Sequence, residues 1–504
     1  SGQAQISGDF STDEARILTS VLNSGALPVP LVVQEERSVG PLLGSDSIRR
    51  GINSIVVGSI LVIVFVLIYY FLGGLITIIC LLLDLLFVLA GLHLFRATLT
   101  LPGIAGMILT LGMAVDANVL IFERIREELK LNKPLSIAVK NGFDRAKRTI
   151  LDANVTTLIA AFFLFLYGTG PIKGFATTLS LGIAASLFTA VFIGRIVFTL
   201  LLDMNLKSFR MLSLVRSTHI NFVKFRKIWI SVSLVLIVAS MFNFYRRGED
   251  MYGVDFKGGQ ILEYRLTPPV KVDKVRSVLE EEGVTATSIT EFKDMEGGVV
   301  IKSSEDISSR IDEILKNNFE EATELKVTTV GPAVGKILRK KAYLAIFLSL
   351  LGILIYVAFR FKHFDFALAA VAALFHDVVI SLGLLTFAGY EVNLLIVTAL
   401  LTIAGYSIND TIVIYDRIRE ITPKMRKSSL SSIINSAING TLSRTIITSV
   451  TTLMVVASIF FLGGEALEGF SFTLLVGIMA GTYSSVYIAS PLVLFFRRAK
   501  SRTK

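Results

Sequence analysis

Two acidic residues stand inside apolar stretches of this 504-residue sequence, and each is followed by a cluster of Arg and Glu. The first stretch, residues 112–127, carries Asp116, and the second, residues 405–420, carries Asp410. An ionised Asp at mid-bilayer costs several kcal/mol, so it requires a partner, a wet cavity or a proton. Two such acids in one chain indicate that protons move through this protein.

Polar neighbours surround both acids. Asn118 follows Asp116, and Asp410 lies between Asn409 and Thr411. Two interpretations stay open for each acid: a neutral Asp hydrogen-bonded between helices, or a titrating carboxylate on a proton path. The near-equivalent positions favour the second interpretation, because the two acids can face each other across the junction of a repeat.

Arg444 begins a later apolar run and has two interpretations. It either extends to lipid phosphates at the interface or reaches inward as the counter-ion of Asp410 or Asp116. For Arg148, its counterpart in the repeat, the interfacial interpretation is favoured. Asp152 lies within about one turn and is close enough in sequence to pair with Arg148.

Asp84 and Asp377 form a second pair of acids, each central in an apolar run, and His376 precedes Asp377. They either extend a proton relay or make structural hydrogen bonds between spans. Glu123 and Asp416 lie at basic ends of spans, where ordinary interfacial salt bridges explain them.

The composition is that of a polytopic membrane protein, with 53% hydrophobic residues, 18% charged residues and a mean hydropathy of +0.68. The net charge of +10 is concentrated in loops rather than on a nucleic-acid surface. A lone Cys80 excludes intrachain disulfides, and four scattered His residues disfavour a metal site. The chain begins at Ser1 in polar sequence, and we expect a preceding part with a first membrane anchor.

Runs long enough to cross roughly 30 Å of hydrocarbon recur along the chain. The basic segments 123–149, 203–227 and 416–444 are expected in the cytoplasm by the positive-inside rule. Residues 1–48 then lie on the opposite side. The expected spans are about 53–72, 75–95, 101–122, 150–168, 175–202, 228–245, 342–359, 364–388, 392–415, 445–462 and 470–496.

Two soluble blocks accompany the spans. Residues 1–48 are predicted to form a β-α-β unit, with strands at 3–10 and 31–39. Residues 247–335 have the order β-α-β-β-α-β, which is typical of ferredoxin-like domains. The glycine-rich loop 253–259 is interpreted as a tight turn at the start of a strand. A phosphate-binding loop would have Lys followed by Ser or Thr after its glycines, and here the glycines lead into a strand instead.

The membrane part is an internal repeat, because residues 53–202 align span by span with residues 342–496. The loop charges give both halves the same direction. We therefore expect a polytopic α-helical membrane protein with two parallel-related bundles, a pseudo-two-fold axis along the membrane normal, and small α+β ferredoxin-like domains. Polar sites are expected at the seam between the halves.

The sequence resembles the SecD and SecF subunits of the bacterial protein-export machinery, joined as one polypeptide of the resistance-nodulation-division superfamily. The resemblance covers nearly the whole chain. It is carried by the motifs at 112–119, 152–157, 255–259, 407–411, 415–419 and 442–445.

The resemblance implies a domain order. The expected parts are the end of a first periplasmic domain (1–48), five SecD-like spans (49–203), a cytoplasmic linker (204–227), a first SecF-like span (228–246), a second periplasmic domain (247–335), five further spans (336–497) and a basic tail (498–504).

The resemblance also implies a function: use of the proton gradient to promote preprotein export and release from the SecYEG channel. The family's charged intramembrane residues correspond to Asp116, Asp410 and Arg444. The implied partners are SecYEG, unfolded preproteins, membrane lipids and, as further candidates, YajC and YidC, in the bacterial inner membrane. No enzymatic activity, nucleic acid, metal or cofactor other than the proton is implied.

Two other functions share features with this sequence. A related proton-coupled exporter of lipid or drug shares the repeat, but such pumps use bulkier exported domains than residues 247–335. An intramembrane aspartyl protease is suggested by Tyr415-Asp416, but Asp416 adjoins Arg417 at a span end and no Gly-x-Gly-Asp partner is present.

Overall fold

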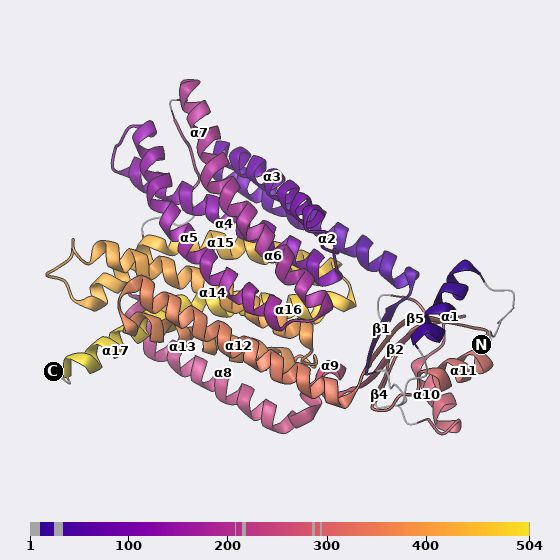
Figure 1. Ribbon diagram of the computed structural model, residues 1–504. Coiled ribbons are helices and arrows are strands. Elements are labelled where there is room, and N and C mark those ends of the chain that lie inside the picture. The colour runs from indigo at the N-terminus through magenta and orange to yellow at the C-terminus, as the bar shows by residue number, and fades with distance from the viewer. Residues whose placement is uncertain are drawn as a thin grey trace.

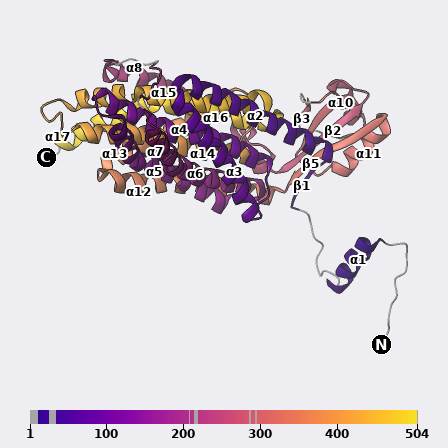
Figure 2. The same cartoon turned by 90° about the horizontal axis from the view of Figure 1, so that it is seen from above.

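The computed structural model describes residues 11–24, 34–206, 208–213, 218–284, 288–292 and 295–502. In these residues, 11 helices are long and apolar enough to cross a membrane. They form a bundle with a β-sheet at one end (Figure 1), and the view from above in Figure 2 also places the sheet beyond the helix ends. This architecture confirms the predicted fold class.

The two halves repeat the same succession of helices. The first half contains α2 (Pro41–Tyr70), α3 (Leu72–Leu94), α4 (Leu101–Lys130), α5 (Leu135–Tyr167), α6 (Gly170–Phe188), the π-helical segment η1 (Thr189–Ile193) and α7 (Gly194–Asp203). The second half contains α12 (Pro332–Phe361), α13 (Phe364–Phe387), α14 (Leu394–Ile421), α15 (Leu430–Leu462), α16 (Glu465–Ser484), the π-helical segment η4 (Ser485–Ala489) and α17 (Ser490–Arg502).

Both halves begin with a Gly-Pro pair. Gly40 precedes α2 and Gly331 precedes α12, each with a φ of −66°, and the following Pro fits the first helical turn because its missing N–H would have no partner there. The helix α8 (Arg226–Arg247), preceded by the 3₁₀ turn η2 (Phe222–Phe225), packs beside α13.

Helices α4 and α14 form the centre of the bundle, since 94% and 100% of their most apolar stretches are buried. Small residues allow each one to approach the other half closely. A Cβ added at Gly112 would lie 3.3 Å from Cα of Thr452, and a Cβ added at Gly405 would lie 3.0 Å from Cα of Thr157. The seam between the halves is therefore built from α4 against α15 and α14 against α5.

The sheet has the strand order β1-β5-β2-β4-β3 and is antiparallel throughout. The predicted ferredoxin-like order is confirmed, and β1 of the first soluble block extends this sheet by pairing with β5. The sheet elements are β1 (Glu35–Val39), β2 (Gly259–Thr267), α10 (Val272–Glu281), β3 (Ser288–Glu291), β4 (Gly298–Ser303), α11 (Ser308–Asn318) and β5 (Glu321–Val330).

The rest of the first soluble block is described only in part. The helix α1 (Thr12–Ser24) is present, and Glu14 accepts hydrogen bonds from the N–H and hydroxyl of Ser11 at its start. The predicted strand at 3–10 and the first residues of the predicted strand at 31–39 lie outside the described residues.

The loop 253–259 turns into β2 as expected, with Gly258 and Gly259 at φ values of +85° and +118° that glycine adopts readily. Before the turn, Val254–Lys257 forms the short helix α9, which follows the 3₁₀ turn η3 (Gly248–Met251).

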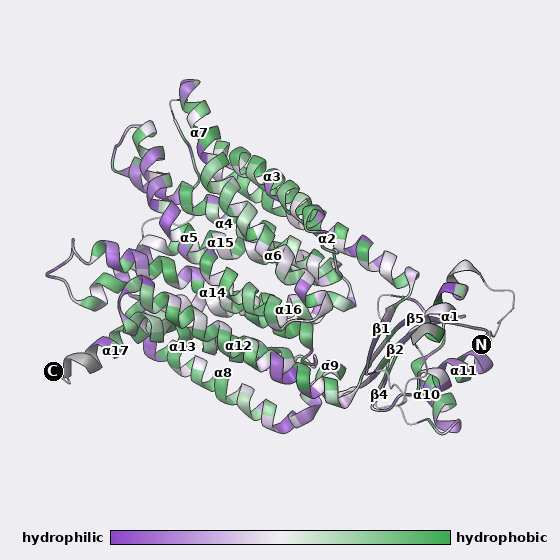
Figure 3. Ribbon diagram, viewed as in Figure 1, coloured by the Kyte–Doolittle hydropathy of each residue, from purple (hydrophilic) through white to green (hydrophobic). Residues whose placement is uncertain are grey.

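The predicted basic loops 123–149 and 416–444 are largely helical. Only residues 131–134 separate α4 from α5, and residues 422–429 separate α14 from α15. Glu, Lys and Arg favour helix, so the helices continue past the apolar spans. Figure 3 shows hydrophilic residues at these helix ends, opposite the sheet. We call the two ends of the bundle the basic end and the sheet end.

Candidate functional site

The central contact of the seam is an ion pair between the halves. Arg444 of α15 donates from Nη2 to Oδ1 of Asp116 of α4 at 3.2 Å. Asp116 is 9% exposed and Arg444 is 4% exposed. Arg444 therefore reaches inward, and the interfacial interpretation is wrong for it, whereas Arg148 is exposed.

Asp410 completes this centre from α14. It lies beside Thr445 and within electrostatic range of both Asp116 and Arg444. We refer to Asp116, Asp410 and Arg444 as the acid–arginine centre. One cation faces two carboxyl groups here, so at least one proton or a further positive charge is needed to balance the centre when it is fully desolvated.

Arg444 uses only part of its hydrogen-bonding capacity. Its Nε and Nη1 atoms are buried and have no hydrogen-bond partner within the described residues. Buried donors in this condition cost roughly 1–3 kcal/mol each. The guanidinium therefore keeps two donors that a second acceptor could bond.

The amides predicted at the site hold backbone positions instead. Asn118 donates to the Ala114 carbonyl at 3.1 Å. Asn409, with its amide oriented to satisfy its surroundings, donates to the carbonyls of Gly405 at 3.3 Å and Ala153 at 3.0 Å. Thr411 is buried at 2% exposure. The side-chain amides of Asn118 and Asn409 thus donate to backbone carbonyls of helices rather than to the charged groups.

The second pair of acids has diverged between the halves. Asp377 accepts hydrogen bonds from Ser407 at 2.6 Å, from Ser484 at 2.8 Å and from His376 at 2.8 Å. Asp84 is 1% exposed, and neither of its carboxyl oxygens has a hydrogen-bond partner in the part of the chain that the structure describes.

Asp152 belongs to a different contact from the one expected. Arg360 of α12 donates to its Oδ2 at 2.6 Å, and Tyr356 donates to its Oδ1 at 2.8 Å. The pairing with Arg148 is therefore wrong. Asp152 instead joins α5 of the first half to α12 of the second, because those helices lie side by side at the seam.

Tyr406 is a site residue that the sequence patterns did not single out. Its hydroxyl donates to Thr452 Oγ1 at 2.9 Å and to the Thr448 carbonyl at 3.3 Å. The ring is buried within electrostatic range of all three charges of the acid–arginine centre. One feature of the sequence could have pointed to Tyr406: it is a Tyr within an apolar span, whereas the aligned residue of the first half is Met113.

A polar cavity of about 890 Å³ lies at the basic end, between α4, α14, α15 and the linker before α8. Arg444 is its deepest lining residue on α15, and Leu120 and Val413 line it on the two central helices. The cavity therefore extends from the basic end as far as Arg444 of the acid–arginine centre.

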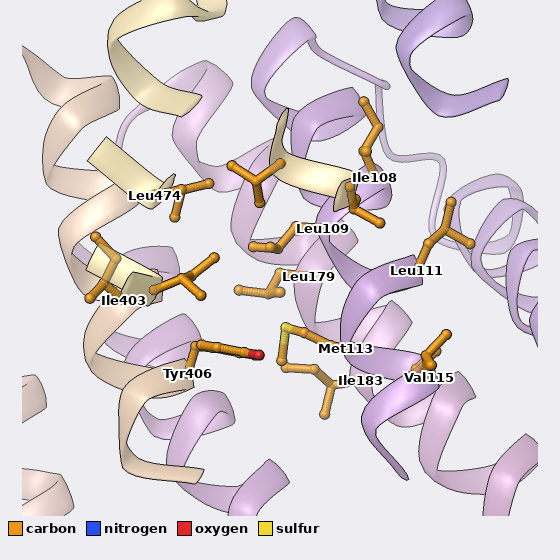
Figure 4. Close-up of a cluster of buried hydrophobic side chains, with 14 of the residues drawn as sticks. Ile108, Leu109, Leu111, Met113, Val115, Leu179, Ile183, Ile403, Tyr406 and Leu474 are labelled. Atoms are coloured by element: carbon orange, nitrogen blue, oxygen red, sulfur yellow. The ribbon is translucent and has the colours of Figure 1, made fainter. Parts of the chain in front are cut away.

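An apolar cluster closes the other side of the centre. Figure 4 shows side chains from four helices gathered here: Ile108, Leu109, Leu111, Met113 and Val115 of α4, Leu179 and Ile183 of α6, Ile403 and Tyr406 of α14, and Leu474 of α16. Most of them precede Asp116 or Asp410 on α4 and α14, which run toward the basic end, so the cluster lies on the sheet side of the acid–arginine centre.

Four charges bridge the central helices along the cavity. Arg124 of α4 contacts Glu127 at 2.9 Å and Glu420 of α14 at 3.3 Å. Arg417 of α14 contacts Glu420 at 2.7 Å and Glu127 at 3.4 Å. This charge ring obeys the pseudo-symmetry of the repeat and joins the ends of the two halves.

The fold and site define a multi-pass helical membrane protein with an internal repeat and a buried acid–arginine centre at its seam. The chain matches the family described as "Protein export membrane protein SecD/SecF, C-terminal" over residues 27–204 and 310–499. The chain belongs to this SecD/SecF family.

Individual relatives agree with this assignment. The chain is 40% identical over 510 residues to the protein translocase subunit SecDF of Thermus thermophilus (99% of this chain, 68% of the relative). It is 35% identical over 508 residues to the corresponding subunit of Brucella abortus (98% and 66%). The crystal structure of the Thermus SecDF, titled a translocon-associated membrane protein, matches with a TM-score of 0.88 and 40% identity, over 98% of this chain and 68% of that chain. The chain thus spans about two thirds of the length of these relatives.

Proposed function

We propose that this protein uses the proton-motive force to promote preprotein export and release on the periplasmic side, as an accessory subunit of the Sec translocase. The observation that carries the proposal is the Asp116–Arg444 pair, made between the halves beside Asp410 and reached by a polar cavity. The relatives named protein translocase subunits support the role in export.

The proton step begins at Asp116. In the arrangement described, Asp116 is charged and paired with Arg444, and the cavity leads to the basic, cytoplasmic end. In a second arrangement that opens toward the sheet end, protonation of Asp116 from that side removes its charge and releases Arg444, which then favours Asp410. Each proton crossing about 100 mV supplies about 2.3 kcal/mol, enough to shift a two-state equilibrium about 50-fold.

Movement at the centre has a direct route to the sheet. Asp255, in the loop before β2, accepts from the N–H of Leu394 at 3.0 Å, the first residue of α14. Its other oxygen accepts from Arg37 of β1 at 2.8 Å. One carboxylate thus joins the helix that carries Asp410 to both soluble segments.

Further bonds strengthen this connection. Val392, just before α14, donates to the Met251 carbonyl at 2.7 Å and accepts from the N–H of Gly253 at 3.0 Å. Glu391 pairs with Lys302 of β4 at 2.8 Å. A displacement of α14 along its axis would therefore move the sheet, which is the part placed to act on an emerging polypeptide.

SecYEG and unfolded preproteins are the partners proposed for this activity, in the bacterial inner membrane, with YajC and YidC as further candidates. The proton is the coupling ion, and no cofactor or enzymatic step is proposed.

Reconstitution tests the proposal. Vesicles containing the protein and SecYEG are energised with a proton gradient, and proton flux and preprotein translocation are measured together. D116N and D410N should abolish flux and export stimulation, whereas D144N, which removes an exposed partner of Arg195, should change neither. Normal flux and stimulation in both D116N and D410N would overturn the proposal.

A further inference from the structure

A second polar network lies in the second half, outside the acid–arginine centre. His376 Nδ1 is 2.8 Å from Oδ1 of Asp377, and His376 Nε2 is 2.7 Å from the hydroxyl of Tyr483. The Tyr483 hydroxyl is in turn 3.1 Å from Ser233 Oγ of α8. These four side chains come from α13, α16 and α8, and His376 is 4% exposed.

The network reaches the helix that carries Asp410. Ser407 of α14 donates to Oδ2 of Asp377 at 2.6 Å. Ser407 precedes Asp410 by less than one helical turn. A short hydrogen bond therefore joins the His376–Asp377 pair to α14.

The network keeps its hydrogen bonds whether His376 is neutral or charged. With a neutral imidazole, Nδ1–H donates to Asp377 and Nε2 accepts from Tyr483, whose oxygen accepts from Ser233. With a proton added at Nε2, His376 donates to Tyr483, and the Tyr483 hydroxyl turns to donate to Ser233. The hydroxyls of Tyr483 and Ser233 can each act as donor or acceptor. One proton can therefore bind to or leave His376 without leaving a buried polar group unpaired.

The first half has lost this network although it keeps the acid. The residues aligned with His376, Ser407 and Tyr483 are Leu83, Ala114 and Phe188. Asp84, aligned with Asp377, consequently has no donor within the described residues. The second half alone combines an imidazole, a carboxylate and two reversible hydroxyls at this place.

We propose that His376 is a second proton-binding residue of this protein, held by Asp377 and Tyr483, and that its charge sets the proton affinity of Asp410 through Ser407. The titratable groups in contact with His376 are Asp377 on its own helix and Tyr483 on α16, among the residues described. The inference rests on the proposed function, because it concerns the same proton cycle.

The imidazole can be observed directly. The chain contains four His residues, so 15N-labelled histidine gives few signals and H376Q assigns the one from His376. In the reconstituted protein this signal should titrate between the neutral and charged forms. Y483F, which copies Phe188 of the first half, should shift its midpoint, and so should D410N. D144N, which removes the exposed partner of Arg195, is the control and should leave the midpoint unchanged.

Proton flux measured against pH gives the second readout. H376Q and Y483F should each move the pH profile by about one unit or more relative to the wild-type protein, with D144N unchanged. If D410N abolishes flux but H376Q and Y483F keep the wild-type profile, or if the His376 signal does not titrate, this inference is overturned while the proposed function stands. If D116N and D410N both keep full flux, the proposed function fails.

Discussion

Arg444 and Asp116 belong to different halves of the repeat, yet Arg444 Nη2 lies 3.2 Å from Asp116 Oδ1. The pair is buried, so its strength depends strongly on whether Asp116 is charged. Any motion that separates α4 from α15 must break it. The protonation of one carboxyl group is thereby linked to the relative position of the two halves.

Removing the carboxylate should cost stability as well as transport. D116A leaves the Arg444 guanidinium buried without its partner, and breaking a buried pair in this way typically costs about 3–5 kcal/mol. Thermal unfolding in detergent should show a clear drop in Tm. The double variant D116A/R444M should recover most of it, because the unpaired guanidinium is gone and a proton can neutralise the remaining carboxyl group of Asp410; a double variant less stable than D116A would contradict this account.

The charge ring should control access to the cavity. E127Q together with E420Q removes both acids that join Arg124 to Arg417, so the basic ends of α4 and α14 should separate more often. A cysteine placed at Ser443, which lines the cavity, should then react several-fold faster with a polar thiol reagent. D312N, which removes the surface partner of Lys316, is the control. Equal labelling rates in all three backgrounds would show that the ring does not restrict the cavity.

The close approach at the seam should tolerate no larger residue. G405V places a branched side chain against the backbone of Thr157, where a Cβ alone would already be 3.0 Å from Cα. Overpacking of this kind costs about 1–3 kcal/mol or more. G44V is the matched control in α2, because a Cβ there meets nothing within 4 Å. The measurement is thermal stability, and similar losses in the two variants would argue against a tight seam at Gly405.

Asp255 should be needed for coupling rather than for proton movement. D255A removes the acceptor that joins Leu394 of α14 to Arg37 of β1. Flux in vesicles should stay near the wild-type value, while stimulation of preprotein translocation falls several-fold. D46A, which removes the partner of Arg50 in α2, serves as the control. Loss of both activities in D255A, with the fold intact, would place Asp255 in the proton path instead.

The sequence predicted what depends on local pattern and repetition. Apolar length indicated the spans, and the aligned stretches at 112–127 and 405–420 pointed to a common seam. The convergence of Asp116 with Arg444 followed as one of two open interpretations. The structure was needed to choose between them, because the side to which an Arg at a span end turns depends on its neighbours in space.

Contacts between segments that are distant in the sequence could not be predicted from the residues around each partner. Asp152 is paired by Arg360 from the other half, and β1 joins a sheet formed mainly by much later residues. Tyr406 shows a different difficulty, since its ring suits an apolar span and only the acids around it reveal a polar role. The helices also extend past their apolar stretches, because charged residues that end a membrane span do not end a helix.

The most direct test of the central claim is infrared difference spectroscopy of the reconstituted protein as a proton gradient is applied and removed. The account predicts a protonated-carboxyl band that appears and disappears with the gradient in the wild-type protein, changes in R444Q and is absent in D116N. An identical band in the wild-type protein and D116N, or no carboxyl band while flux continues, would contradict the claim that Asp116 is charged and discharged during the cycle.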